Sequence, residues 1–173
     1  MKITKRGQSL VEMALISPFL IMILLMVVDC GRAAYDYSTL AAAAREGARA
    51  AITTGNNRPD NSRVIGAAQA NAIGLALSAG NCVNDTPAPT QAMTANTGFI
   101  YVGGGGGNAT PNAPAGQASA AVGACQAVVP SYAGHNPLTV TIKYSFMPLT
   151  PFGSQFFPTG IVMTVTSTMS TEY

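Results

Sequence analysis

The stretch "MALISPFLIMILLMVV" (13–28), followed closely by "GRAAYDYSTLAAAAREGARAAI" (31–52), decides the fold. The first segment contains no charged residue. Together with residues 9–12 it reaches about 20 residues, or ~30 Å of helix, enough to cross the apolar core of a bilayer. The second segment is dominated by alanine, the best helix former. We therefore predict one nearly continuous helix of about 45 residues, ~68 Å long.

Two features bear on the membrane-spanning part of this helix. Pro18 lies in its first half, where it is expected to kink the helix or loosen one turn. Lysine and arginine residues precede the span and Asp29 follows it, which places the N-terminus in the cytoplasm. The alternatives are a cleaved secretory signal, with a mature chain that starts near Ala34, and a lipoprotein signal that ends at Cys30. The bulky and acidic residues before Cys30 fit the second alternative poorly.

The alanine-rich segment is predicted to present one apolar face to the rest of the protein. Its members recur in helical steps of three and four residues. Arg32 and Asp36 fall on the other side, spaced as an i,i+4 pair. The predicted apolar face consists of Ala33, Tyr37, Leu40, Ala44, Ala48 and Ala51.

The remainder predicts a small α+β domain. A second amphipathic helix is expected from about residues 60–62 to Ala79, with Gly80 as its stop. The run "FIYV" (99–102) is a candidate strand within a loop-rich stretch. "LTVTIKYSF" (138–146) alternates apolar and polar residues, and "IVMTVTSTMSTEY" (161–173) is rich in threonine and valine. These two runs are predicted to pair antiparallel and to pack one apolar face on the amphipathic part of the long helix.

The composition argues against several classes of function. Residues 1–63 hold eight of the nine Lys/Arg and five of the seven Asp/Glu, so the last 110 residues are almost uncharged. No basic stripe is present to bind nucleic acid. The few titratable groups are too scattered to predict an enzyme, a metal site, a cofactor or a small-molecule substrate. The glycine run 103–107 is not followed by Lys-Ser/Thr, as a phosphate-binding loop requires.

Three cysteines stand at positions 30, 82 and 125. If the polar half lies outside the cytoplasm, Cys82 and Cys125 are the natural disulfide pair. Such a bond would close a loop of roughly 40 residues and stabilise the domain by about 4 kcal/mol in the chain-entropy model. The alternative is two unpaired cysteines.

Glu12 is the one acidic residue within the apolar part of the helix. A charged carboxylate in hydrocarbon is costly unless it is paired, so an acid at this position suggests a function. If the chain were cut after Gly7, a new ammonium group would appear at Gln8, one helical turn before Glu12. A partner subunit's ammonium would serve equally well and would favour a staggered bundle of helices. The alternative is a neutral glutamate tolerated near the membrane interface.

The short basic leader ending in glycine, followed by "QSLVE" (8–12), resembles the prepilins that prepilin peptidase cleaves. The segments "RGQSLVEMALISPFL" and "VVDCGRAAYDYSTLAAAAREGARAA" resemble the TadE-like pseudopilins of the tight-adherence (Flp) pilus system, and the C-terminal strand pair supports the likeness loosely. The resemblance implies cleavage between Gly7 and Gln8 by an inner-membrane peptidase, with Glu12 as the acid that sets subunit register. Gln8 departs from the aromatic residue usual in the broader class of type IV pilins, which puts N-terminal methylation in doubt.

The expected organisation is therefore a leader (1–7), a helical spine (8–54) and an extracytoplasmic domain (55–173) containing a flexible loop (81–137). The resemblance implies a minor pilin of the bacterial inner membrane, with prepilin peptidase, other pilin subunits and the assembly platform as partners. The size of the domain argues against the very short major pilin. The alternative function is an uncleaved, single-pass, membrane-anchored binding protein.

Overall fold

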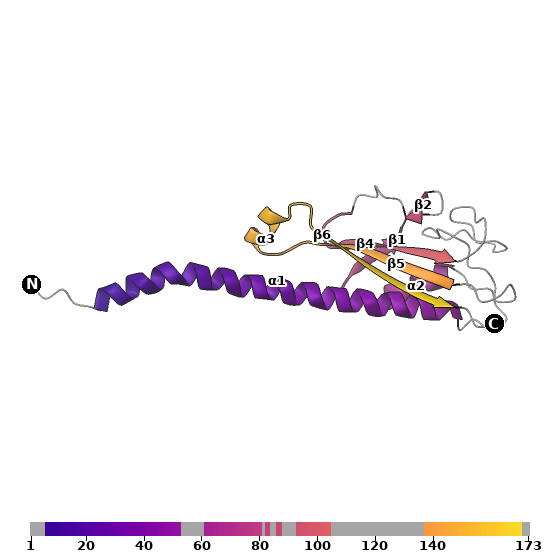
Figure 1. Cartoon of the computed structure of the whole chain (residues 1–173), viewed down its shortest axis with the longest axis horizontal. Coiled ribbons are helices and arrows are strands. Elements are labelled where there is room, and N and C mark those ends of the chain that lie inside the picture. Colours follow the sequence, from indigo (N-terminus) through magenta and orange to yellow (C-terminus); the bar gives the residue numbers. More distant parts are fainter. Residues whose placement is uncertain are drawn as a thin grey trace, which may run out of the picture.

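The long helix predicted from the sequence is present as one element. The computed structural model describes residues 6–52, 61–80, 82–83, 86–87, 93–104 and 137–170. Helix α1 (Arg6–Ile52) runs for 47 residues and contains Pro18. Figure 1 shows the helix bending in its N-terminal part, the region of this proline, where a backbone N–H is missing from the hydrogen-bond ladder.

The second helix is shorter than the sequence predicted. Helix α2 (Asn61–Asn71) ends well before Ala79, and residues Ala76–Ala79 form strand β1. Gly74 adopts a φ of 79°, a left-handed conformation that glycine reaches without steric cost and that turns the chain out of the helix. The Gln69 side-chain amide then donates to the carbonyl of Leu77 at 3.0 Å, which holds the new strand beside the helix it left.

A four-stranded sheet with the order β1-β4-β5-β6 forms the domain. Strands β4 (Thr97–Gly104), β5 (Pro137–Phe146) and β6 (Ile161–Ser170) pair antiparallel, whereas β1 pairs with β4 in parallel. The predicted antiparallel pairing of the C-terminal runs is confirmed, and the whole sheet is mixed. Two short strands, β2 (Cys82–Val83) and β3 (Thr86–Pro87), form a separate ladder. Helix α3 (Pro151–Phe156) lies in the connection between β5 and β6.

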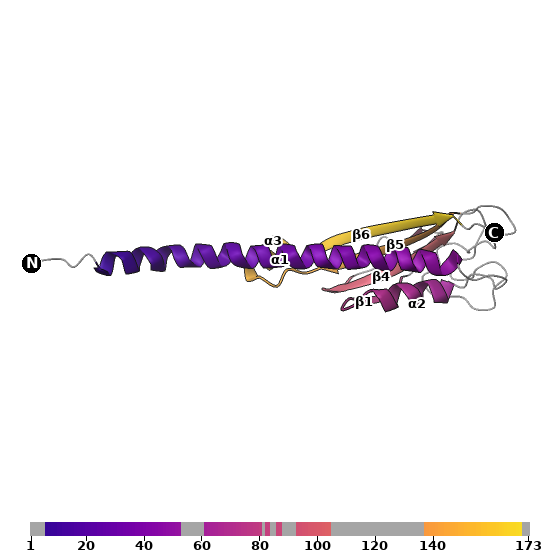
Figure 2. The ribbon, with the colours of Figure 1, turned by 90° about the horizontal axis from the view of Figure 1, so that it is seen from below.

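The core lies between this sheet and the second half of α1. Figure 2 shows α1 and α2 side by side against the sheet. The alternation predicted for β5 is confirmed from Val140 to Phe146, because Val140, Ile142, Tyr144 and Phe146 are buried. Thr139 and Thr141 instead contact the β6 threonines Thr168 and Thr166, at 3.1 and 3.3 Å between the hydroxyl oxygens. The central buried residues are Leu40, Ala44, Val64, Ile100, Val140, Ile142, Tyr144 and Phe146.

The buried face of α1 differs from the predicted one. Leu40, Ala44 and Ala48 are buried as expected, but Tyr37 is 52% exposed and Asp36 is 7% exposed. The helix meets α2 as well as the sheet, so the buried stripe is wide and includes Ala43 and Gly47. A Cβ atom at Gly47 would lie 3.1 Å from the Cβ of Ala68, which shows how closely the two helices approach. The side chain of Ala51 lies outside the described residues.

Candidate functional site

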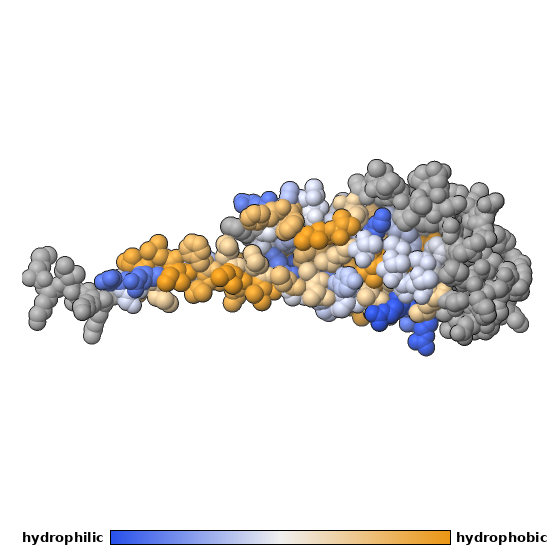
Figure 3. All heavy atoms as spheres, in the orientation of Figure 1, coloured by the Kyte–Doolittle hydropathy of each residue, from blue (hydrophilic) through white to orange (hydrophobic). Residues whose placement is uncertain are grey.

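The first half of α1 is an uncovered apolar surface. The helix is long and apolar enough to cross a membrane; its most apolar 18-residue window has a mean hydropathy of 2.5, and none of that window is buried. Figure 3 shows this hydrophobic surface continuing along the helix away from the domain. Its exposed large side chains include Leu10, Val11, Leu15, Phe19, Leu20, Ile23, Leu24 and Val28.

The residues predicted for processing and register lie at the start of this surface. Gly7, Gln8 and Glu12 are all exposed in the first turns of α1. A Cβ atom at Gly7 would meet nothing within 4 Å, so packing does not require a glycine there. Glu12 makes no ion pair with any residue in the part of the chain that the structure describes. Residues 1–5 of the predicted leader lie outside the described residues.

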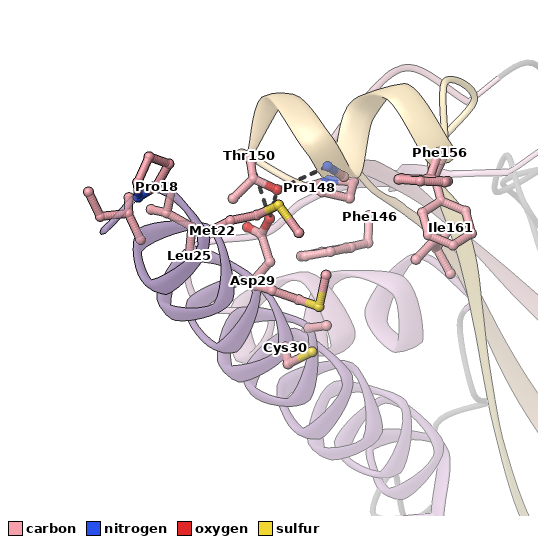
Figure 4. A pocket seen from close by; sticks show the side chains of 15 residues that line it. Pro18, Met22, Leu25, Asp29, Cys30, Phe146, Pro148, Thr150, Phe156 and Ile161 are labelled. Carbon is pink, nitrogen blue, oxygen red and sulfur yellow. Dashed lines mark hydrogen bonds between the residues drawn. The ribbon is translucent and has the colours of Figure 1, made fainter. Parts of the chain in front are cut away.

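A second set of polar contacts joins α1 to the β5–β6 connection, where the apolar surface ends. The backbone N–H of Leu149 donates to Asp29 Oδ1 at 3.2 Å, and that of Thr150 donates to Asp29 Oδ2 at 3.2 Å. The Thr150 hydroxyl donates to the same Oδ2 at 2.6 Å (Figure 4). Hydrogen bonds to a charged carboxylate are roughly twice as strong as neutral ones. We call Asp29, Leu149 and Thr150 the clasp.

Thr150 belongs both to the clasp and to α3. Its hydroxyl oxygen accepts from the N–H of Gly153 at 3.1 Å, and Pro151 follows at the first helical position. A threonine cap followed by proline is a helix-start signal that the sequence contained and that the prediction missed. The role of Asp29 was also missed, because its partners stand about 120 positions away in the chain.

Arg32 lies beside the clasp. Its Nη1 atom is 3.8 Å from Asp29 Oδ1, and the guanidinium lies over the Phe146 ring at 5.5 Å. Nη1 is buried and makes no hydrogen bond with a described residue. The sequence suggested Asp36 as the partner of Arg32, but the carboxylate within ion-pair distance is that of Asp29. Burial raises the pKa of the Tyr144 phenol, the Asp36 carboxylate raises it further, and Arg32 lowers it.

An apolar groove of about 930 Å³ runs between α1 and the β5–β6 connection (Figure 4). The wall from α1 includes Met22, Leu25 and Met26, and the opposite wall includes Pro148 and Phe156. The clasp lies along its length, since Asp29 and Thr150 also line it. The groove holds almost no polar surface, so its chemistry suits hydrocarbon.

The predicted disulfide between Cys82 and Cys125 stays a prediction. Cys30 is an exposed free thiol on α1. Cys82 lies in β2, and Cys125, its predicted partner, lies outside the described residues. Among the described residues, no group of three His, Cys, Asp or Glu side chains is placed to hold a metal ion.

The part of the chain that resembles a known protein family lies entirely within α1. Residues 7–49 match the sequence model of the TadE-like protein family. This match confirms the resemblance seen in the sequence and indicates involvement in a tight-adherence pilus system. No curated protein and no solved structure matches the chain. The matched segment includes the exposed apolar surface, Glu12 and Asp29, but ends before the sheet.

Proposed function

We propose that this protein is a minor pilin, or pseudopilin, of a tight-adherence (Flp-type) pilus system. It acts by lateral packing of its helix in pilus biogenesis or adhesion, and it carries out no catalysis of its own. Before assembly it is a single-pass protein of the bacterial inner membrane, with its N-terminus in the cytoplasm and its domain outside. Prepilin peptidase, other pilin subunits and the assembly platform are its partners.

The observation that carries the proposal is the division of α1 into two parts. Its second half is packed into the domain, whereas its first half presents a continuous surface of large aliphatic side chains to the surroundings. A surface of this kind needs either lipid or other apolar helices to cover it. A subunit that passes from the membrane into a helical bundle meets both in turn, and the TadE-like match covers this helix.

Processing would give Glu12 its partner. Cleavage between Gly7 and Gln8 leaves an ammonium group one helical turn from the Glu12 carboxylate. Glu12 is exposed on a helix whose neighbouring large side chains are apolar, so a neighbouring subunit's ammonium can approach it as readily as its own. Pairing between subunits would fix the axial stagger of the bundle, because an unpaired charge in apolar surroundings is costly.

The test is the mass of the mature N-terminus, measured with and without prepilin peptidase. We expect a start at Gln8 only when the peptidase is present, and no cleavage of the Gly7→Ala variant. Gly31→Ala is the matched control, because an added Cβ meets no atom within 4 Å at either glycine and both lie in the same helix. Loss of cleavage in Gly7→Ala alone then reports recognition by the peptidase.

The same measurement separates the alternatives. A chain that still starts at Met1 in the presence of the peptidase supports the uncleaved, membrane-anchored binding protein and contradicts our proposal. A start near Ala34 supports secretion. Cleavage there would remove Asp29 and Arg32, and with them the hydrogen bonds that hold Leu149 and Thr150 on the helix, which weighs against that alternative.

A further inference from the structure

The β5–β6 connection has an exposed apolar surface of its own. Leu149 and Phe156 are 72% and 70% exposed, and Phe157 is 48% exposed. At the start of β6, Ile161 and Val162 are also exposed. From 144 to 171 the sequence contains no Asp, Glu, Lys, Arg or His. Soluble domains rarely group large apolar side chains in this way without a partner that covers them.

The clasp fixes where this surface lies along α1. Leu149 and Thr150 are bonded to Asp29, the first residue after the apolar segment that ends at Val28. Figure 1 shows α3 beside the middle of α1, displaced from the sheet toward the N-terminal half of the helix. The groove beneath it is lined by residues of the apolar segment itself, among them Met22 and Leu25 (Figure 4). The exposed side chains of the connection are therefore held at the level where the predicted membrane span ends.

Most backbone N–H groups of the connection have acceptors within the protein, as a medium poor in water requires. A segment that leaves water must satisfy its own N–H groups. Three of the fourteen positions from 147 to 160 are prolines, which have no N–H group. Seven others donate to acceptors within the protein, namely Met147 to Asn96, Leu149 and Thr150 to Asp29, Gly153 and Ser154 to Thr150, Phe157 to Gly153, and Gly160 to Phe157.

We propose that α3 and its flanking residues 149–162 form a second membrane contact, which seats in the headgroup and outer acyl region of the bilayer that α1 spans. The occupant of this surface is phospholipid. Aromatic and aliphatic side chains without charge, held at the end of a transmembrane helix, are the groups that favour this interfacial depth. The contact would hold the domain against the membrane surface until the subunit is extracted. The inference rests on the membrane span of the proposed function.

The chain contains no tryptophan, so a single introduced tryptophan is a unique fluorescent reporter. Full-length variants Leu149→Trp and Phe156→Trp would be reconstituted in phosphatidylcholine–phosphatidylglycerol vesicles, with lipids brominated at shallow or deep acyl positions as quenchers. Phe19→Trp, 67% exposed in the apolar segment, is the membrane control. Tyr37→Trp, 52% exposed and about 12 Å beyond Asp29 along the helix, is the water control.

We expect Leu149→Trp and Phe156→Trp to emit at shorter wavelength than Tyr37→Trp and to lose most emission to the shallow quencher. Phe19→Trp should lose most to the deep quencher. Emission and quenching equal to those of Tyr37→Trp would overturn the inference while leaving the span intact. A blue shift without quenching, growing with the protein-to-lipid ratio, would also overturn it, because a second copy would then cover the surface. Absence of quenching in Phe19→Trp would contradict the membrane span itself, and would therefore overturn both the proposed function and this inference.

Discussion

The two halves of α1 differ in the size of their side chains and in what covers them. Before Asp29 the helix carries leucine, isoleucine, methionine, valine and phenylalanine, and all of these side chains except the half-buried Met22 are exposed. After Asp29 alanine is the commonest residue and large aliphatic side chains are few, and Ala43, Ala44, Gly47 and Ala48 are buried. Small residues let α2 approach the helix axis closely, since a Cβ atom at Gly47 would lie only 3.1 Å from that of Ala68. The more hydrophobic half is thus the half that does not contribute to its own domain's core.

This difference separates two kinds of hydrophobic surface. The alanine half is complementary to one particular neighbour and is covered in the isolated subunit. The large side chains of the aliphatic half are left exposed by the described residues, and they suit lipid before assembly and other helices after it. Changes in the second half should therefore alter the stability of the domain, and changes in the first half should alter insertion or assembly.

The largest effect is expected at Glu12. Glu12→Gln should abolish pilus assembly while membrane insertion stays normal, because the bundle loses the charge that pairs with a subunit N-terminus. Filaments counted by electron microscopy and subunits recovered in membrane fractions give the two readings. Glu46→Gln is the matched control, since Glu46 is exposed in the packed half of the same helix and should be tolerated. Normal filaments in Glu12→Gln would contradict the register hypothesis.

Next in size is the loss of a core side chain from the packed half. Leu40 is fully buried, so Leu40→Ala should lower the free energy of unfolding by about 2–5 kcal/mol. The same change at Leu20, which is 56% exposed in the aliphatic half, should alter the stability of the domain by no more than about 0.5 kcal/mol. Denaturant unfolding of both variants in detergent measures the contrast. Equal losses would show that the two halves share one core.

The clasp between the halves comes third. Asp29→Ala removes three hydrogen bonds and the carboxylate beside Arg32, so we expect the domain to lose about 1.5–3 kcal/mol. Thr150→Val keeps both backbone bonds to Asp29 but removes the hydroxyl's bond to Asp29 and its cap on Gly153, so it should cost about 1–2 kcal/mol. Hydrogen exchange should accelerate at Leu149 and Thr150 in Asp29→Ala. Unchanged exchange at these two amides would show that Asp29 does not hold the connection.

The smallest effect is expected at the helix glycines, and its sign should differ between them. Gly31→Ala should stabilise the domain by up to about 1 kcal/mol, because alanine favours helix and an added Cβ meets nothing within 4 Å. Gly47→Ala should lose that gain, since its Cβ would lie 3.2 Å from the carbonyl oxygen of Val64. Thermal unfolding of the two variants gives the comparison. An equal gain at both would mean that α1 and α2 are less closely packed.

Much of the fold could be predicted because its signals are local. The uninterrupted apolar run and the alanine run predict one helix through propensity and length alone, and α1 confirms it. The alternation in 138–146 predicts a strand with one buried face, and Val140, Ile142, Tyr144 and Phe146 are buried. The pattern at Gly7, Gln8 and Glu12 is also local, although cleavage and register stay predictions.

The errors have a common origin in contacts between distant parts of the chain. The apolar residues up to Ala79 recur at helical spacing, yet residues 76–79 form a strand that pairs with β4. Gly74 turns the chain out of the helix, and the hydrogen bonds to β4 then outweigh the weak helix propensity of this segment. Asp36 was placed on the side of the helix opposite the apolar face, but it is buried, because α1 packs against α2 as well as the sheet. From the sequence, Asp29 was interpreted only as the residue that follows the membrane span. In the structure its carboxylate also accepts hydrogen bonds from the backbone N–H groups of residues 149 and 150.

By itself, the sequence determined the long helix, its apolar first half, the strand pair and the TadE-like pattern at its start. Each of these depends on the order of side chains along the chain, and so on forces that act within a few residues. Only the tertiary structure decided where α3 lies and that Asp29 joins the end of the apolar segment to the β5–β6 connection. These depend on hydrogen bonds and burial between residues about 120 positions apart, which no local pattern records.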